Sequence, residues 1–162
     1  MLFYVKNALQ QTGLDPARLE LEITESAVLG DMDLVVERLE QLRSLGVELA
    51  IDDFGTGYCS LSYLKNLPVD RMKVDRAFVA NIEVDKKSQA ILQSIVSLGQ
   101  AMSLKVLAEG VEIEEQANIL RSIGCHEVQG FLYAKPVDAL DFETWFRRRE
   151  SSRLGKMIER RS

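Results

Sequence analysis

The sequence predicts an α/β protein with a parallel sheet, because short segments of strand periodicity alternate strictly with longer segments of helical periodicity. No Pro/Gly-rich linker divides the 162 residues into two domains. Such a sheet is either doubly wound or curved into a (β/α) barrel. Polar side chains stand at or just beyond the end of every expected strand, which favours the barrel, where sites collect residues from many strands.

The individual elements follow from periodicity and from glycine breaks. Residues 3–12 have apolar positions at helical spacing and stop at Gly13, a typical helix C-cap. Residues 19–24 alternate apolar and acidic side chains, and residues 31–45 return to helical spacing. This strand–helix unit then repeats to the end of the chain. The expected strands are residues 19–24, 47–51, 71–74, 105–108 and 127–129. The expected helices are residues 3–12, 31–45, 60–66, 87–102, 114–123 and 140–148.

Composition excludes several classes of function. With 46% hydrophobic residues the chain can form a packed core, and a formal charge of −5 argues against duplex nucleic acid as a partner. A small phosphorylated ligand stays compatible with this charge if metal ions neutralise it. Two cysteines and a single histidine, without ligand spacing, argue against zinc and indicate reduced thiols. Neither a membrane span nor a signal peptide is recognisable, so we expect a cytoplasmic protein.

The chain ends in a basic segment, residues 149–162, which we expect to be a tail outside a domain formed by residues 1–148. A solvated helix end and frayed terminus is the simpler interpretation of its arginines and lysines. Binding to a partner or an anionic surface is the less favoured alternative.

The segment IDDFGTGYCSL is the most informative, because Asp52 and Asp53 adjoin at a strand end before a glycine-rich loop. Together with Glu22 and Glu109 they would offer the hard oxygen ligands that two divalent ions need for phosphoryl displacement. Lys73 could orient a water or offset charge on the phosphate. The alternative is ordinary surface chemistry: solvated acidic residues, an Asp-Asp turn and a surface ion pair. The residues alone leave both interpretations open.

Four segments carry a resemblance to a known family. LELEITES, AIDDFGTGYCSLSYLKNLPVDRMKVDRAFV, LAEGVE and EVQGFLYAKP resemble successive motifs of EAL-domain proteins, cyclic-di-GMP-specific phosphodiesterases, from about Gly13 to Pro136. The resemblance implies a modified TIM barrel in which two Mg²⁺ or Mn²⁺ ions activate water to open cyclic di-GMP to linear pGpG.

The resemblance also implies a role for each matching residue. Metal ligands would be Glu22, Asp52, Asp53 and Glu109. Lys73 would be the catalytic lysine that holds the water, with Glu109 beside it in catalysis. Gln129 and Asp75 would lie near substrate, while Glu25 and Glu112 would brace the loop after the Asp pair or the ligand pocket.

The sequence also departs from the family pattern. No Glu-Ala-Leu triplet and no metal-binding Asn segment precede the first expected helix, so the first strands of the barrel are expected to be missing. A partial TIM barrel of about five strands is therefore predicted, with weak or no hydrolysis by this chain alone. The alternatives are a degenerate module that binds nucleotide or protein without chemistry, and a homodimer or a second chain that supplies the missing strands.

Overall fold

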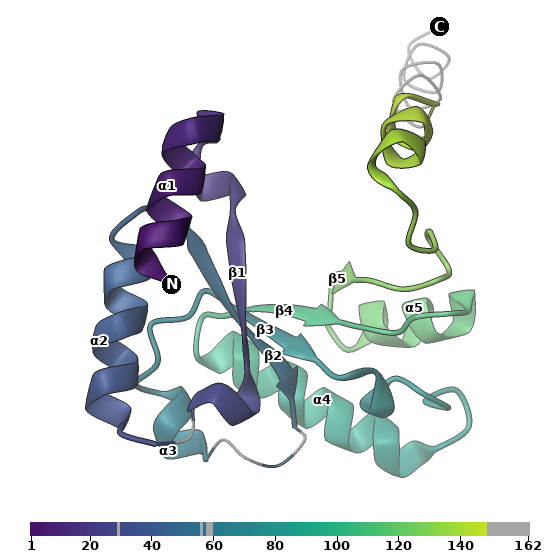
Figure 1. Cartoon of the computed structure of the whole chain (residues 1–162). Helices are drawn as coiled ribbons and strands as arrows, with labels where there is room; N and C mark the ends of the chain where they lie inside the picture. Colours follow the sequence, from purple (N-terminus) through teal and green to yellow (C-terminus); the bar gives the residue numbers. More distant parts are fainter. Residues whose placement is uncertain (29, 56, 58–59, 149–162) are drawn as a thin grey trace, which may run out of the picture.

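The computed structural model describes residues 1–28, 30–55, 57 and 60–148. Five strands alternate with helices, as predicted (Figure 1). The strands are β1 Glu20–Thr24, β2 Glu48–Phe54, β3 Arg71–Val74, β4 Lys105–Ala108 and β5 Glu127–Val128. The α-helices are α1 Leu2–Thr12, α2 Met32–Arg43, α3 Leu61–Leu64, α4 Lys86–Ala101 and α5 Glu114–Ser122. Three 3₁₀ helices are η1 Pro16–Arg18, η2 Glu25–Val28 and η3 Arg76–Phe78.

All strand pairs are parallel, and the order in the sheet is β1-β2-β3-β4-β5, which is the chain order. The predicted fold class, five parallel strands alternating with helices, is therefore confirmed. Within the described residues β1 and β5 are the edge strands of this sheet. Helical residues 139–148 follow β5 and stand apart from the sheet in Figure 1, and residues 149–162 of the predicted tail lie outside the described part.

The two faces of the sheet differ in chemistry, because side chains alternate along each strand. One face carries the buried apolar residues Leu49, Ile51, Met72, Val74 and Ala108. These pack in one hydrophobic core with apolar side chains of α2, α4 and α5. The register places the charged residues on the opposite face, where Glu22 aligns with Ala50, Ala50 with Arg71, and Lys73 with Leu107.

The helices begin and end where local chemistry predicts. Asp31 and Asp85 are the N-caps of α2 and α4, and each accepts a backbone N–H with its side chain. Gly13 follows α1 in the left-handed region, with φ 66°, as its C-cap position suggests. No helix among the described residues is long and apolar enough to cross a bilayer.

Candidate functional site

A β-bulge in β2 sets the position of the two adjacent aspartates. The sequence predicts that the strand ends at Ile51 and that the pair lies in the turn, whereas β2 continues to Phe54. Ile51 pairs with Met72 and Phe54 with Val74, so β2 has one residue more than β3 across this interval. Asp53 adopts φ 55°, which interrupts the alternation of side chains along the strand. This irregularity replaces the predicted turn as the reason why both carboxylates lie on one side.

Lys73 on β3 occupies the centre of the site. Its Nζ lies 2.6 Å from Glu22 on β1, 3.0 Å from Asp52 on β2 and 2.8 Å from Glu109, which follows β4. The Lys73 side chain is only 5% exposed. Burial alone would lower the pKa of Lys73, but the carboxylates of Glu109, Glu22 and Asp52 outweigh it and raise the pKa above its ordinary value. Lys73 is therefore a cation throughout the physiological pH range.

Three carboxylates lie close enough to share a divalent cation. Asp52, Asp53 and Glu109 each offer one oxygen, and these oxygens lie within 4.8 Å of one another. Oδ1 of Asp52 is buried and has no well-formed hydrogen bond within the described residues, although it is near the Lys73 ammonium. A buried carboxylate oxygen and a set of hard oxygen donors both suit a divalent metal ion. Glu22 is outside this group of three, but it contacts Lys73 as Asp52 and Glu109 do.

The surroundings of Asp53 shift the pKa of its carboxyl. Desolvation, then the charges of Asp52 and Asp75 and a hydrogen bond with the Asp75 side chain, raise the pKa of Asp53, and Lys73 opposes this only in part. Asp75 also accepts the backbone N–H of Ala77 at 2.8 Å and so begins η3. Asp75 thus lies beside the group of three carboxylates, where its own carboxyl already has two partners.

Glu25 lies beneath the loop that follows the aspartate pair. The residue is 2% exposed, and its Oε2 accepts the backbone N–H of Gly55 at 3.0 Å. Gly55 has φ 101°, and a Cβ built there would lie 2.6 Å from the ring of Phe78. Only glycine fits this position, so the start of the loop is held between Glu25 and Phe78.

A cavity of about 640 Å³ opens beside Glu109 and contains two other predicted residues, Glu112 and Gln129. Its wall also includes Arg76, at the start of η3, and Phe131, which follows β5. The sequence analysis missed both residues. The signal was available, because each follows a predicted site residue by one or two positions just beyond the end of a strand.

The sequence matches a family model and several curated proteins. The EAL domain model matches residues 1–136, so it includes α1, which precedes the motifs quoted above. "Cyclic di-GMP phosphodiesterase NbdA" from Pseudomonas aeruginosa is 46% identical over 143 residues, which are 88% of this chain and 18% of the relative. The chain spans about a fifth of the length of the curated relatives that it matches.

Several solved structures also resemble this chain in sequence and fold. The structure described as "PaMucR Phosphodiesterase, c-di-GMP complex" has a TM-score of 0.82 and 45% identity, over 87% of this chain and 57% of that one. A manganese and cyclic-di-GMP complex of Klebsiella pneumoniae BlrP1 has a TM-score of 0.77 and 38% identity, over 83% of this chain and 34% of that one. With the family model covering most of the sequence, the chain belongs to the EAL domain family.

Proposed function

We propose that this chain provides the metal-binding and nucleotide-binding strands of a phosphodiesterase that hydrolyses cyclic di-GMP to linear pGpG. The observation that carries the proposal is one buried ammonium, Lys73, in contact with carboxylates from three strands beside the bulged Asp52–Asp53 pair. Two relatives support it, since NbdA is named a cyclic di-GMP phosphodiesterase and PaMucR was solved as a complex with c-di-GMP.

We assign the ligands of a two-metal site, incomplete in this chain, to Asp52, Asp53 and Glu109, with Glu22 as a fourth ligand that would give up its contact with Lys73. Mg²⁺ or Mn²⁺ is the proposed metal, because all four donors are carboxylate oxygens and a related structure contains manganese. When bound, such ions lower the pKa of a water and stabilise charge on a phosphoryl oxygen. Four carboxylates opposite one lysine leave the excess negative charge that a divalent cation would neutralise.

Lys73 and Glu109 are the proposed catalytic residues. Because its carboxylate neighbours raise its pKa, Lys73 stays protonated and cannot accept a proton from water. It can instead donate hydrogen bonds that orient a water or stabilise developing phosphate charge. Glu109 contacts Lys73 at 2.8 Å and also lines the adjacent cavity, so it connects the metal ligands with the substrate space.

The cavity beside Glu109 is the proposed nucleotide-binding space. Its volume of about 640 Å³ is in the range of small-molecule sites. Gln129 and Glu112 offer polar groups for a base or ribose, and Phe131 offers an aromatic face. Asp75 belongs to the proposed substrate-binding set through its contact with Asp53. Glu25 is the proposed brace of the loop, through its hydrogen bond to Gly55.

Turnover by the 162-residue chain is expected to be slow or absent. The family resemblance assigns two further ligands, a first-strand Glu and an Asn, to segments that this sequence does not contain. Without these two ligands the carboxylates present would hold divalent ions less tightly and would activate a water less well. Formation of pGpG should be followed by chromatography with Mg²⁺ and with Mn²⁺. Family-like turnover by the purified chain would contradict this expectation.

The second candidate is a module that binds nucleotide without chemistry. It is favoured by the contacts of the Lys73 ammonium with Glu22, Asp52 and Glu109, which offset part of the carboxylate charge. Calorimetry of c-di-GMP with wild type, Lys73→Ala and the control Lys105→Ala, with and without Mn²⁺, separates the two. The phosphodiesterase proposal expects metal binding in all three proteins and any turnover to be lost only in Lys73→Ala. Nucleotide binding that neither chelation nor Lys73→Ala affects would support the binding module.

The open edges β1 and β5 also suggest a partner: a second copy of the chain, or a chain that supplies further strands. Light scattering tests this proposal, because a monomer at all concentrations would contradict the homodimer. Addition of a separate polypeptide that carries the first strands of a related EAL domain should increase turnover if strands can be supplied in trans.

A further inference from the structure

A second layer of charged side chains lies below the proposed metal site on the same face of the sheet. Glu20, Arg71 and Glu127 precede Glu22, Lys73 and Gln129 by two residues on β1 and β3 and at β5, so each pair shares a face. Two residues of strand correspond to about 6.6 Å. Glu20, Arg71 and Glu127 therefore form a row parallel to Glu22, Lys73 and Gln129, two residues nearer the beginnings of the strands.

Arg71 connects strands that have no hydrogen bonds to each other. Its Nε donates to Glu20 at 2.6 Å, and its Nη1 donates to Glu127. β1 and β3 are separated by β2, and β3 and β5 by β4, so each link crosses about 10 Å of sheet. In a flat sheet β1 and β5 would be about 19 Å apart, and one guanidinium that contacts carboxylates from both requires the edges to curve toward β3.

The position of Glu22 beside Lys73 depends more strongly on the curvature of the sheet than the positions of Asp52 and Glu109 do. Its side chain is 48% exposed, and it lies on an edge strand whose described hydrogen-bonding neighbour is β2 alone. By contrast, Asp52 lies on β2 and Glu109 directly follows β4, and both of these strands are next to β3. The 2.6 Å contact between Glu22 and Lys73 therefore depends on how far the sheet curves from β1 to β3, and side-chain contacts that join these two strands help to set that curvature.

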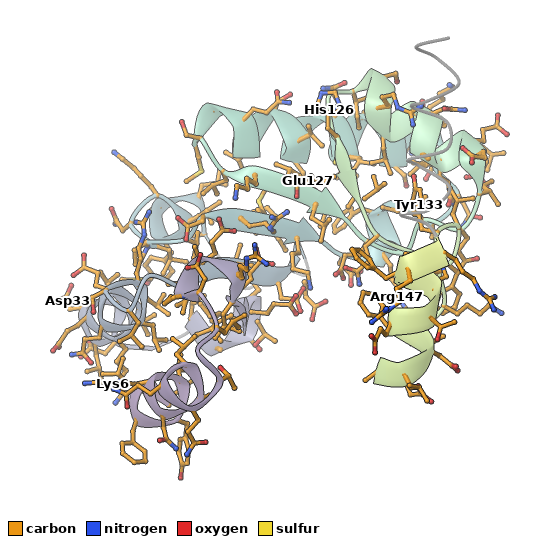
Figure 2. The ribbon with its side chains drawn as sticks, turned by 90° about the horizontal axis from the view of Figure 1, so that it is seen from above. Lys6, Asp33, His126, Glu127, Tyr133 and Arg147 are labelled. Carbon is orange, nitrogen blue, oxygen red and sulfur yellow. The ribbon has the colours of Figure 1, made fainter. Side chains whose placement is uncertain are left out.

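Figure 2 shows Glu127 toward the middle of the molecule, while the preceding residue, His126, lies at its rim. The alternation places Glu127 on the Arg71 side of β5. Arg71 is 15% exposed and its planar fork can serve two carboxylates at once, which an ammonium does less well.

We propose that Arg71 is a positioning residue: through Glu20 it holds β1 against β3 and so keeps Glu22 beside Lys73 and the metal site. The role of Glu22 as a ligand rests on the proposed function, but its placement beside Lys73 does not. Arg71 touches neither substrate nor metal in this scheme and acts only through Glu20.

If Arg71 acted only through its charge, its removal would change the affinity for a divalent cation in the opposite direction. Loss of the Arg71 charge leaves Glu20 and Glu127 unpaired below the site, which would strengthen the attraction of a divalent cation. The positioning role predicts weaker binding, because β1 and Glu22 are released. Loss of an outer partner of a metal ligand typically reduces affinity by about 10–100-fold.

Glu20→Met and Glu127→Met form a matched pair, because each removes one carboxylate from the same guanidinium, and only Glu20 shares a strand with Glu22. Two readouts are needed: Mn²⁺ affinity by calorimetry, and the nitrogen-15 NMR signal of the Lys73 ammonium without metal. We expect Glu20→Met and Arg71→Met to weaken Mn²⁺ binding by about tenfold and to broaden the Lys73 signal, with little change of either in Glu127→Met.

Equal effects of the two Glu variants, or tighter Mn²⁺ binding by Arg71→Met, would overturn the positioning role. Arg71→Lys keeps the charge and guards against misfolding of Arg71→Met; it should give an intermediate loss. If wild type binds no Mn²⁺ while the Lys73 signal responds only to Glu20→Met and the Arg71 variants, the proposed metal function fails and the positioning role stands.

Discussion

Replacement of Lys73 by Met tests the balance of charge at the centre of the site. The change removes an ammonium that is 5% exposed and lies 2.6–3.0 Å from three carboxylates. Removal of one partner from a buried ion pair costs about 3–5 kcal/mol. Because these carboxylates are themselves partly exposed, we take the lower end, about 3 kcal/mol, which corresponds to a fall in Tm of about 6–12 °C.

A divalent metal should reverse much of this loss. Mn²⁺ at a hundred times its Kd stabilises a protein by about 2.7 kcal/mol. In the variant the ion no longer competes with the Lys73 ammonium for the same oxygens, so Mn²⁺ should raise Tm more than it does in wild type.

Lys105→Met is the matched control, because Lys105 contacts Glu48 at 2.8 Å on the same face but is about half exposed. Its loss should cost less than about 1 kcal/mol, and Mn²⁺ should affect it as it affects wild type. Thermal unfolding by circular dichroism, with EDTA or Mn²⁺, measures all three proteins. A Lys73→Met variant as stable as Lys105→Met, or an equal Mn²⁺ shift in all three, would refute the reasoning.

Three further predictions concern packing and titration. Gly99→Ala should destabilise the fold by about 1–3 kcal/mol in urea titrations, because a Cβ there would lie 2.3 Å from Val106 and 2.9 Å from Met72. Cys125 should resist iodoacetamide at pH 8 until the protein unfolds, as seen by peptide mass spectrometry, because burial raises its pKa to about 11 and leaves little thiolate. The pKa of Asp53 in the folded protein is raised above its ordinary value of 3.8. The free energy of unfolding of the metal-free protein should therefore fall as the pH rises from 3.8 through this raised pKa. Asp53→Asn should abolish this loss, and a Tm profile between pH 4 and 7 that is unchanged by the substitution would contradict it.

The parallel strand–helix order was predictable because segments of strand periodicity alternate along the chain with segments of helical periodicity. Lys73 and Glu109 were predictable for a related reason: parallel strands place their carboxyl ends at one edge, wherever their exact bounds fall. The family resemblance supplied roles for Gln129 and Glu25 that periodicity alone does not contain.

Other features depend on three-dimensional contacts and left no local signal. The bulge at Asp53 arises from the pairing of β2 with β3, and a strand boundary guessed from composition stops short at Ile51. The attachment of Glu20 and Glu127 to Arg71 joins residues that are 51 and 56 positions apart. Alternation predicts that these side chains share a face, but not that one guanidinium reaches both.

The extra residue in β2 contributes to the site but is not needed for the pairing of β2 with β3. A deletion of Asp53 would let Asp52 pair with Lys73 and Phe54 with Val74, so the ladder between β2 and β3 would become regular. The apolar face would keep its alternation, while one of the three clustered carboxylates would vanish. Loss of one codon would thus remove a carboxylate of the proposed metal site while the pairing of β2 with β3 became more regular.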